Sequence, residues 1–204
     1  MKRWCRCFFP WALPVWVLLV WGAPGGTSLN AAPIRVLFLG HEGKHHHSDV
    51  LFPLLAERLG RDAIYFDYHR SVEAALGDAD YLRRFDAVLL YANHDVISEK
   101  AWTHLEAFIR AGGGFVPVHC ASYCFRNEPD YLALVGAQFK SHQGAVFSPR
   151  TIRPEHPGVA GVGAFTAWDE TYCHTHHAPA DREVLQVRDP LPGDPIDQPE
   201  PWTC

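Results

Sequence analysis

The sequence lacks the signatures of several common protein classes. No basic stripe is present and the formal net charge is −5, so we expect no nucleic-acid partner. Neither a C-x-x-C-H motif nor a pair of C-x-x-C motifs occurs, and no nucleotide signature or internal repeat is found. What remains is a chain of 204 residues, 48% of them hydrophobic, which is enough for one globular domain with a sizeable core.

The first 32 residues also lack the uninterrupted apolar run of about 20 residues that a membrane-spanning helix needs. Three basic residues open the chain, and an apolar run from Phe8 to Trp21, broken by two prolines, leads into small residues. This order is typical of a secretory signal peptide. We therefore expect residues 1–32 to be a signal peptide cleaved near Ala32, and the mature protein to be periplasmic or extracellular, without a membrane partner.

Export permits disulfides among the four cysteines that follow the leader. Two disulfides among four cysteines can form in three ways, and the sequence does not choose among them. The four cysteines are Cys120, Cys124, Cys173 and Cys204.

Apolar runs alternate with helical patterns in the first half of the mature chain. Four strands are predicted, at Ile34–Leu39, Ala63–Tyr68, Asp86–Tyr91 and Phe115–Val118. Helices are predicted from Ser48 or Asp49 to Gly60, around Tyr81 to Phe85, and from Ser98 to Gly112. Strands that are apolar throughout and alternate with helices indicate an α/β fold with a parallel sheet covered on both faces.

Beyond Phe125 the pattern weakens. The sequence there predicts a helical turn and strands of a different, antiparallel kind, at Tyr131–Val135, Phe139–Phe147, Ile152 and Val184–Val187. The proline content of residues 189–204 indicates loop.

The predicted fourth strand delivers His119 and Cys120 to the edge where open α/β sheets bind ligands. Either residue can carry chemistry there. Alternatively, Cys120 is a small buried hydrophobe and His119 a hydrogen-bonded turn residue. Loops after parallel strands converge, so His41, His46 and His94 can meet His119 in space. Imidazoles suit zinc, and a catalytic zinc site holds three protein ligands with one open position. Solvated loop histidines are the alternative.

Six short motifs, in this order, resemble the trehalose-utilisation (ThuA-like) family: I-R-V-L-F-L-G-H-E-G-K-H-H-H-S, Y-A-N-H-D, G-G-G-F-V-P-V-H-C-A-S, L-V-G-A-Q-F-K-S-H-Q, E-H-P-G-V and W-D-E-T-Y-C-H-T. We therefore expect a ThuA-like domain over residues 33–188. The family's fold is similar to that of class I glutamine amidotransferases, a flavodoxin-like, doubly wound, mostly parallel sheet.

Two departures from related patterns matter. Class I amidotransferases place a nucleophilic cysteine directly after this strand, within G-x-C-x-G, whereas His119 stands there in this chain and Cys120 comes one residue late. Glutamine amidotransferase activity is therefore not expected. Similar proteins also continue past a W-T segment into a further strand, so we expect the tail, residues 189–204, to be truncated and the sheet to lack its C-terminal strand.

The resemblance implies an exported protein of trehalose or other sugar utilisation, with a small-molecule carbohydrate as its partner. The corresponding hypothesis gives a divalent metal such as zinc to His41, His46, His119 and His142. It makes His119 and Glu170 catalytic, with Glu170 as a general base or as a partner that orients imidazoles. It assigns the sugar to His94, Tyr123, Trp168 and Tyr172. The simpler interpretation of Glu170 is a loop carboxylate that accepts backbone hydrogen bonds.

Two other functions stay open at this stage. One is a non-catalytic carbohydrate-binding or interaction module, in which the aromatic residues stack on sugar rings or simply fill a core. The other is a cysteine-dependent, amidotransferase-like hydrolase that uses Cys120 and predicts rapid, selective alkylation of one thiol. The sequence names neither the substrate nor the oligomeric state.

Overall fold

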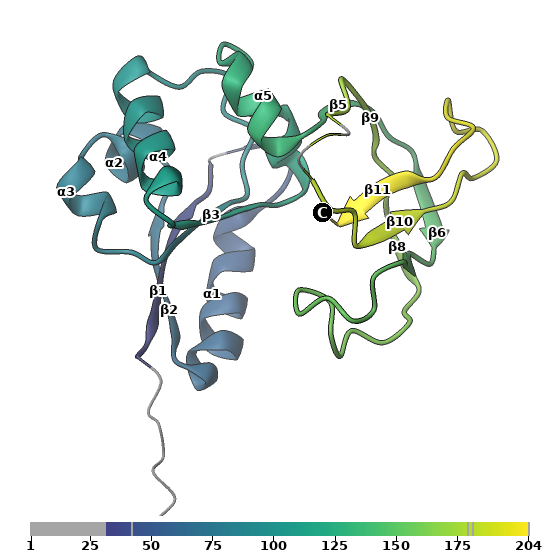
Figure 1. Cartoon of the computed structure of the whole chain (residues 1–204), viewed down its shortest axis with the longest axis horizontal. Helices are drawn as coiled ribbons and strands as arrows, with labels where there is room; N and C mark the ends of the chain where they lie inside the picture. Colours follow the sequence, from purple (N-terminus) through teal and green to yellow (C-terminus); the bar gives the residue numbers. More distant parts are fainter. Residues whose placement is uncertain (1–31, 42, 179, 181, 204) are drawn as a thin grey trace, which may run out of the picture. The chain divides into compact units, whose positions relative to one another are not determined.

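The computed structural model describes residues 32–41, 43–178, 180 and 182–203 (Figure 1), so the expected signal peptide and Cys204 lie outside the described residues. A parallel four-stranded sheet has the strand order β2-β1-β3-β4. Its strands are β1 (Ile34–Leu39), β2 (Ile64–His69), β3 (Ala87–Leu90) and β4 (Gly114–Pro117). This is the start of the flavodoxin-like order, and it confirms the predicted doubly wound α/β fold.

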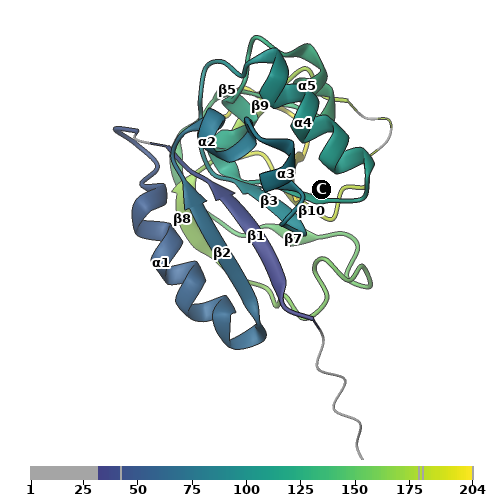
Figure 2. The same cartoon turned by 90° about the vertical axis from the view of Figure 1, so that its left-hand side faces the viewer.

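Helices cover both faces of this sheet (Figures 1 and 2). Helix α1 (Ser48–Leu59) lies on one face. On the other face lie α2 (Val72–Leu76), α3 (Ala79–Leu82) and α4 (Glu99–Arg110). Helix α4 begins as predicted, because Ser98 Oγ accepts a hydrogen bond from the Ala101 amide.

The sequence offers Ser48 or Asp49 as the residue that caps α1, but Ser48 is the first residue of the helix and no side chain caps it. The Ser48 hydroxyl is fully buried and hydrogen-bonds to the backbone of His41, accepting from the amide at 3.0 Å and donating to the carbonyl at 3.2 Å. Tyr68 Oη lies 3.0 Å from the same hydroxyl. A distant backbone partner therefore outcompetes the local capping bond.

From Val36 onward the central strand β1 is buried on both faces, as its apolar run requires. Leu37 and Leu39 pack in the core shared with α2 to α4, and Phe38 points the other way and meets Phe52 of α1 edge-on, at 6.2 Å between ring centroids. The period of two along the strand sends alternate residues to opposite faces. The buried residues of β1 run to its last residue, Leu39, so the loop after β1 begins at Gly40.

The second half of the chain is built mainly from antiparallel strands, as predicted, and lies on the side of the sheet that α1 covers (Figure 1). Two short α and 3-10 segments lead into it, η2 (His119–Tyr123) and α5 (Pro129–Val135). Strand β5 (Gln138–Ser141) pairs with β9 (Cys173–Thr175), and β6 (Gly144–Phe147) pairs with β8 (Ala167–Glu170). A third sheet places β10 (Gln186–Arg188) between β7 (Arg150–Thr151) and β11 (Glu200–Thr203).

The prediction of loop throughout the proline-rich tail is wrong for its last described residues, because they form β11. Pro201 is tolerated since β11 pairs only with β10 and is an edge strand. A buried ion pair holds the segment between the two strands, with Arg188 Nη1 2.5 Å from Asp194 Oδ2. None of the described helices is long and apolar enough to cross a membrane.

Candidate functional site

Three side chains from distant parts of the chain meet beyond the carboxyl ends of the parallel strands. His46 comes from the loop after β1, His119 directly follows the β4 segment, and Glu170 ends β8. One potential ligand atom from each lies within 4.8 Å of the other two. His119 Nε2 is 3.2 Å from Glu170 Oε2, and the two imidazole rings meet edge-on at 4.7 Å between centroids. We call these three residues the histidine–glutamate cluster.

Both histidines of the cluster stand on unusual backbone. The φ angles of His46 and His119 are +60° and +52°, in the left-handed region that non-glycine residues rarely adopt. Local hydrogen bonds hold this conformation: the Ser48 amide donates to the His46 carbonyl at 2.8 Å, and Ser122 Oγ donates to the His119 carbonyl at 3.1 Å. Strain of this kind persists only where surrounding contacts enforce it, and it is frequent at functional sites.

The cluster has the electrostatics of a ligand set. Burial is the main cause that lowers the pKa of both His46 and His119, and the neighbouring imidazoles add to this by disfavouring a further positive charge. Neutral imidazoles keep a lone pair available, which metal binding requires. Glu170 Oε2 is buried and has no well-aligned hydrogen bond among the described residues, with His119 Nε2 3.2 Å away and Tyr172 close to the carboxylate. A buried carboxylate oxygen without a well-aligned hydrogen bond, next to neutral imidazoles, is suited to binding a cation.

The donor set and spacing also suit a metal. Two imidazoles and one carboxylate form a known catalytic zinc set, with a further position left open. Ligand atoms about 2.0–2.2 Å from a tetrahedral zinc lie about 3.4 Å apart, close to the 3.2 Å between His119 and Glu170. The described residues therefore fit a divalent cation at the histidine–glutamate cluster.

Two tyrosines surround the cluster. Tyr172 stacks on His119, with ring centroids 4.3 Å apart, and burial raises its pKa. Tyr91 lies 6.2 Å from the rings of both His46 and His119, and burial raises its pKa to about 12. Sequence reasoning missed Tyr91 as a site residue. The available signal was its position at the end of the third apolar run, where the β3 strand delivers it to the same edge.

The other histidines of the predicted metal set lie outside the cluster. His41 Nε2 donates to the His46 carbonyl at 3.0 Å, so His41 supports the backbone of a cluster residue. His142 lies at the rim, with Nε2 3.9 Å from Glu170 Oε1 and 41% of its side chain exposed. His94 donates from Nε2 to the Gly40 carbonyl at 2.9 Å and stacks on Phe125. Thus the structure brings together only two of the four predicted ligands.

The predicted sugar-binding aromatics have different surroundings. Trp168 precedes Glu170 by two residues on β8, so both lie on the same face of the strand. Gly144 faces Glu170 across the β6–β8 pair, and a Cβ atom there would lie 2.8 Å from the Trp168 ring. The indole therefore extends over Gly144 and stays 71% exposed. Tyr123 instead meets Phe139 edge-on and carries the Arg126 guanidinium on its face, 4.1 Å from the ring centre.

The cysteines of this region are not activated. Cys120 is 2% exposed, and burial raises the pKa of its thiol to about 12. Cys124 is buried too and donates to the Ala92 carbonyl. Cys120, Cys124 and Cys173 are all free thiols in the described part of the chain. A protonated, buried thiol is a poor nucleophile, which argues against a cysteine hydrolase.

The fold and site define a flavodoxin-like α/β protein with a polar cluster at the carboxyl edge of its sheet. The chain matches the ThuA family, described as trehalose utilisation, over residues 35–203. It belongs to that family, which confirms the resemblance found in its motifs.

Two solved structures have a similar fold. A ThuA-like protein from Bacteroides uniformis aligns with a TM-score of 0.69 and 18% identity, over 89% of this chain and 78% of its own. A ThuA-like protein from Parabacteroides merdae aligns with a TM-score of 0.64 and 18% identity, over 76% and 68%. No curated protein sequence shows significant similarity to this chain.

Proposed function

We propose that this protein is exported and acts in the utilisation of trehalose or another sugar, through a divalent metal such as zinc bound at the histidine–glutamate cluster. The observation that carries this proposal is the convergence of two imidazoles and the buried Glu170 carboxylate, whose ligand atoms lie within 4.8 Å of one another and whose Oε2 has no well-aligned hydrogen bond among the described residues. The family supports the link to sugar utilisation.

A zinc ion bound here would polarise a hydroxyl or carbonyl oxygen of a sugar at its open position. The protein residues have separate tasks. His46 and His119 supply neutral nitrogen ligands, and Tyr172 stacks on His119 and fixes its ring plane. Glu170, as a ligand, is not free to act as the general base considered from the sequence. A candidate group to accept a proton is then His142, whose Nε2 lies 3.9 Å from Glu170 Oε1.

The exposed indole of Trp168 supports carbohydrate as the ligand class. An aromatic ring that is 71% exposed on the same strand face as Glu170 gives an apolar surface for the face of a sugar ring. The same observation suits a non-catalytic carbohydrate-binding module. Turnover separates the two functions, because only an enzyme converts the sugar and loses that activity when the metal is removed.

Metal analysis of the purified protein tests the proposal. We expect one zinc or similar ion per chain, removal by a chelator, and recovery on adding zinc. His119→Ala should abolish this binding. Glu170→Gln should weaken it strongly, and Glu155→Gln is the matched control for that change, since Glu155 is exposed and does not belong to the cluster. A metal-free protein that binds added zinc no better than His119→Ala does would overturn the proposal.

A further inference from the structure

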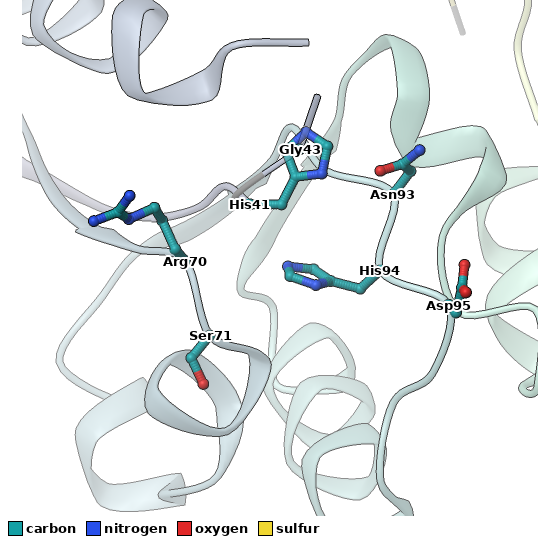
Figure 3. A pocket seen from close by; sticks show the side chains of 7 residues that line it. All are labelled: His41, Gly43, Arg70, Ser71, Asn93, His94 and Asp95. Atoms are coloured by element: carbon teal, nitrogen blue, oxygen red, sulfur yellow. The ribbon is translucent and has the colours of Figure 1, made fainter. Parts of the chain in front are cut away.

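Two cavities adjoin the stacked rings of His94 and Phe125, whose centroids lie 6.3 Å apart. The larger, of about 640 Å³, is lined by His94 and by other residues of the loops after β1, β2 and β3 (Figure 3). The smaller, of about 180 Å³, is lined by Phe125 and by residues of η2, α5 and the start of β5. The smaller cavity therefore borders η2, the segment that begins with the cluster residue His119.

The smaller cavity has an apolar wall that is largely buried. Phe125 and Tyr131 are 0% and 2% exposed and belong to the hydrophobic core. Leu132, Val135 and Ala137 also line it. Its volume is below the range of drug-sized sites, about 300–1,000 Å³. It is close to the roughly 150 Å³ at which a dry, apolar cavity binds benzene. The space therefore fits a ligand of about one aromatic ring.

The hydroxyl and thiol groups of the lining already donate to the backbone. Ser122 Oγ donates to the His119 carbonyl at 3.1 Å, and Tyr131 Oη donates to the Ala121 carbonyl at 2.7 Å. Cys124 Sγ donates to a carbonyl of the loop after β3 at 3.0 Å. Each of these groups has a single proton, so none is left to donate to a ligand.

The charged residues of the lining are engaged as well. Arg126 pairs with Asp95, and its Nη1 also donates to the Tyr123 carbonyl at 2.8 Å. Glu128 Oε1 accepts from the Asp130 amide and so caps α5. A charged ligand would have to compete with these contacts, whereas an apolar ligand leaves them in place.

The segment between the cavity and the histidine–glutamate cluster is strained at both ends. The φ angles of His119 and Phe125 are +52° and +47°, in the left-handed region. Such backbone persists only where its surroundings enforce it, and the Ser122 hydrogen bond to His119 is one such contact, made from the cavity wall. We propose that the cavity binds a small, uncharged apolar molecule and that its occupancy moves His119 through this bond. The inference does not require the proposed metal.

Titration of the metal-free protein with benzene, followed by amide NMR, tests the inference. We expect one benzene to bind saturably per chain and to shift the amides of His119, Ser122 and Phe125. Gly43, which lines the larger cavity, should not shift. Ser122→Ala should still bind benzene but should lose at least half of the His119 shift. A direct effect of the benzene ring on His119 would instead keep the full shift in this variant.

Filling the cavity gives the second test. Leu132→Trp should raise the benzene dissociation constant at least tenfold, because the larger side chain occupies the space. Leu134→Trp is the matched control, since Leu134 is on the same helix, is 41% exposed and does not belong to the cavity lining. Val135→Phe fills the same cavity and replaces Leu132→Trp if that variant does not fold.

The possible outcomes separate this inference from the proposed function. The inference is wrong if benzene does not bind saturably, or if Leu132→Trp binds it as well as Leu134→Trp does. It is also wrong if the His119 amide does not shift, or keeps its full shift in Ser122→Ala. A protein that meets all these expectations but binds no zinc would refute the proposed metal function and leave the apolar site intact.

Discussion

Replacing Glu170 by glutamine would remove the proposed metal ligand and, at the same time, a buried carboxylate oxygen without a well-aligned hydrogen bond. The substitution should therefore change the free energy of unfolding in opposite directions: it should not destabilise the metal-free protein, but it should destabilise the protein in the presence of zinc. Without metal, an unsatisfied buried polar group costs about 1–3 kcal/mol. The introduced glutamine side chain has an amide nitrogen that can donate to a neutral histidine, so we expect the metal-free variant to melt at or above the wild-type temperature.

With metal, the order should reverse. Zinc at about 100 times its dissociation constant stabilises the wild type by about 2.7 kcal/mol. For a chain of this size, 1 kcal/mol corresponds to about 2–4 °C, so zinc should raise the wild-type melting temperature by about 5–11 °C. Loss of a ligand that weakens binding about 100-fold leaves about 0.4 kcal/mol, or about 1–2 °C.

Thermal unfolding followed by circular dichroism measures the melting temperature of each variant without zinc and the rise in that temperature when zinc is added. Glu155→Gln makes the same chemical change on an exposed carboxylate and should keep the full zinc effect. Equal zinc shifts in the wild type and Glu170→Gln would refute Glu170 as a ligand. A metal-free Glu170→Gln that melts well below the wild type would show that the carboxylate is satisfied without metal, and would remove the observation on which the proposal stands.

Further predictions concern the neighbouring thiol, the tail and the leader. Cys120→Ser should leave the zinc dissociation constant within a few-fold, whereas His119→Ala should abolish binding, as measured by calorimetry; the reverse pattern would restore a nucleophilic cysteine. Because burial raises the pKa of Cys120 to about 12, its thiol stays protonated until the pH approaches that value. Iodoacetamide should therefore not modify it in the native protein at neutral pH, and mass spectrometry after a timed reaction checks this. Asp194→Ala should cost about 3–5 kcal/mol in urea unfolding, because it leaves the fully buried Arg188 without its carboxylate. Amino-terminal sequencing of exported protein should begin near Pro33, and an intact Met1 in a membrane fraction would exclude cleavage.

The parallel sheet could be predicted from the sequence because its signals are local. The β1 prediction, Ile34–Leu39, agrees with the structure at both ends, since a strand buried on both faces is almost entirely apolar, here with Arg35 as the exception at its exposed start. Helix α2 was missed because its five residues are too few to show a helical period. Strand β11 was missed because its stability comes from pairing with β10, which local composition does not report.

The site was only partly predictable for the same reason. His119 could be chosen because it directly follows a buried strand. His46 is one of three consecutive histidines, and only the structure shows that His46 is half-buried while His45 and His47 are exposed. The positive φ of His46 turns its side chain toward the cluster. Hydrogen bonds from Ser48 and His41 to the His46 carbonyl hold that conformation, and the adjacent residues His45 and His47 do not reveal it. Glu170 comes from β8, far along the chain from His119, so its approach to the cluster is a property of the fold.

The loop after β1 carries two histidines with different contacts. His46 belongs to the histidine–glutamate cluster, and His41 donates to the His46 carbonyl. Buried Ser48 fixes the backbone of His41, and Gly40 has no side chain because a Cβ there would lie 2.6 Å from the Tyr68 ring. Gly43 lies against the His41 ring, where a Cβ would come within 2.8 Å of Nδ1. The two glycines of the G-H-E-G segment, Gly40 and Gly43, are therefore needed because a side chain would not fit. Their φ angles are ones that other residues can also adopt. This packing sets the position of His41, whose hydrogen bond to the His46 carbonyl supports the backbone of the histidine–glutamate cluster.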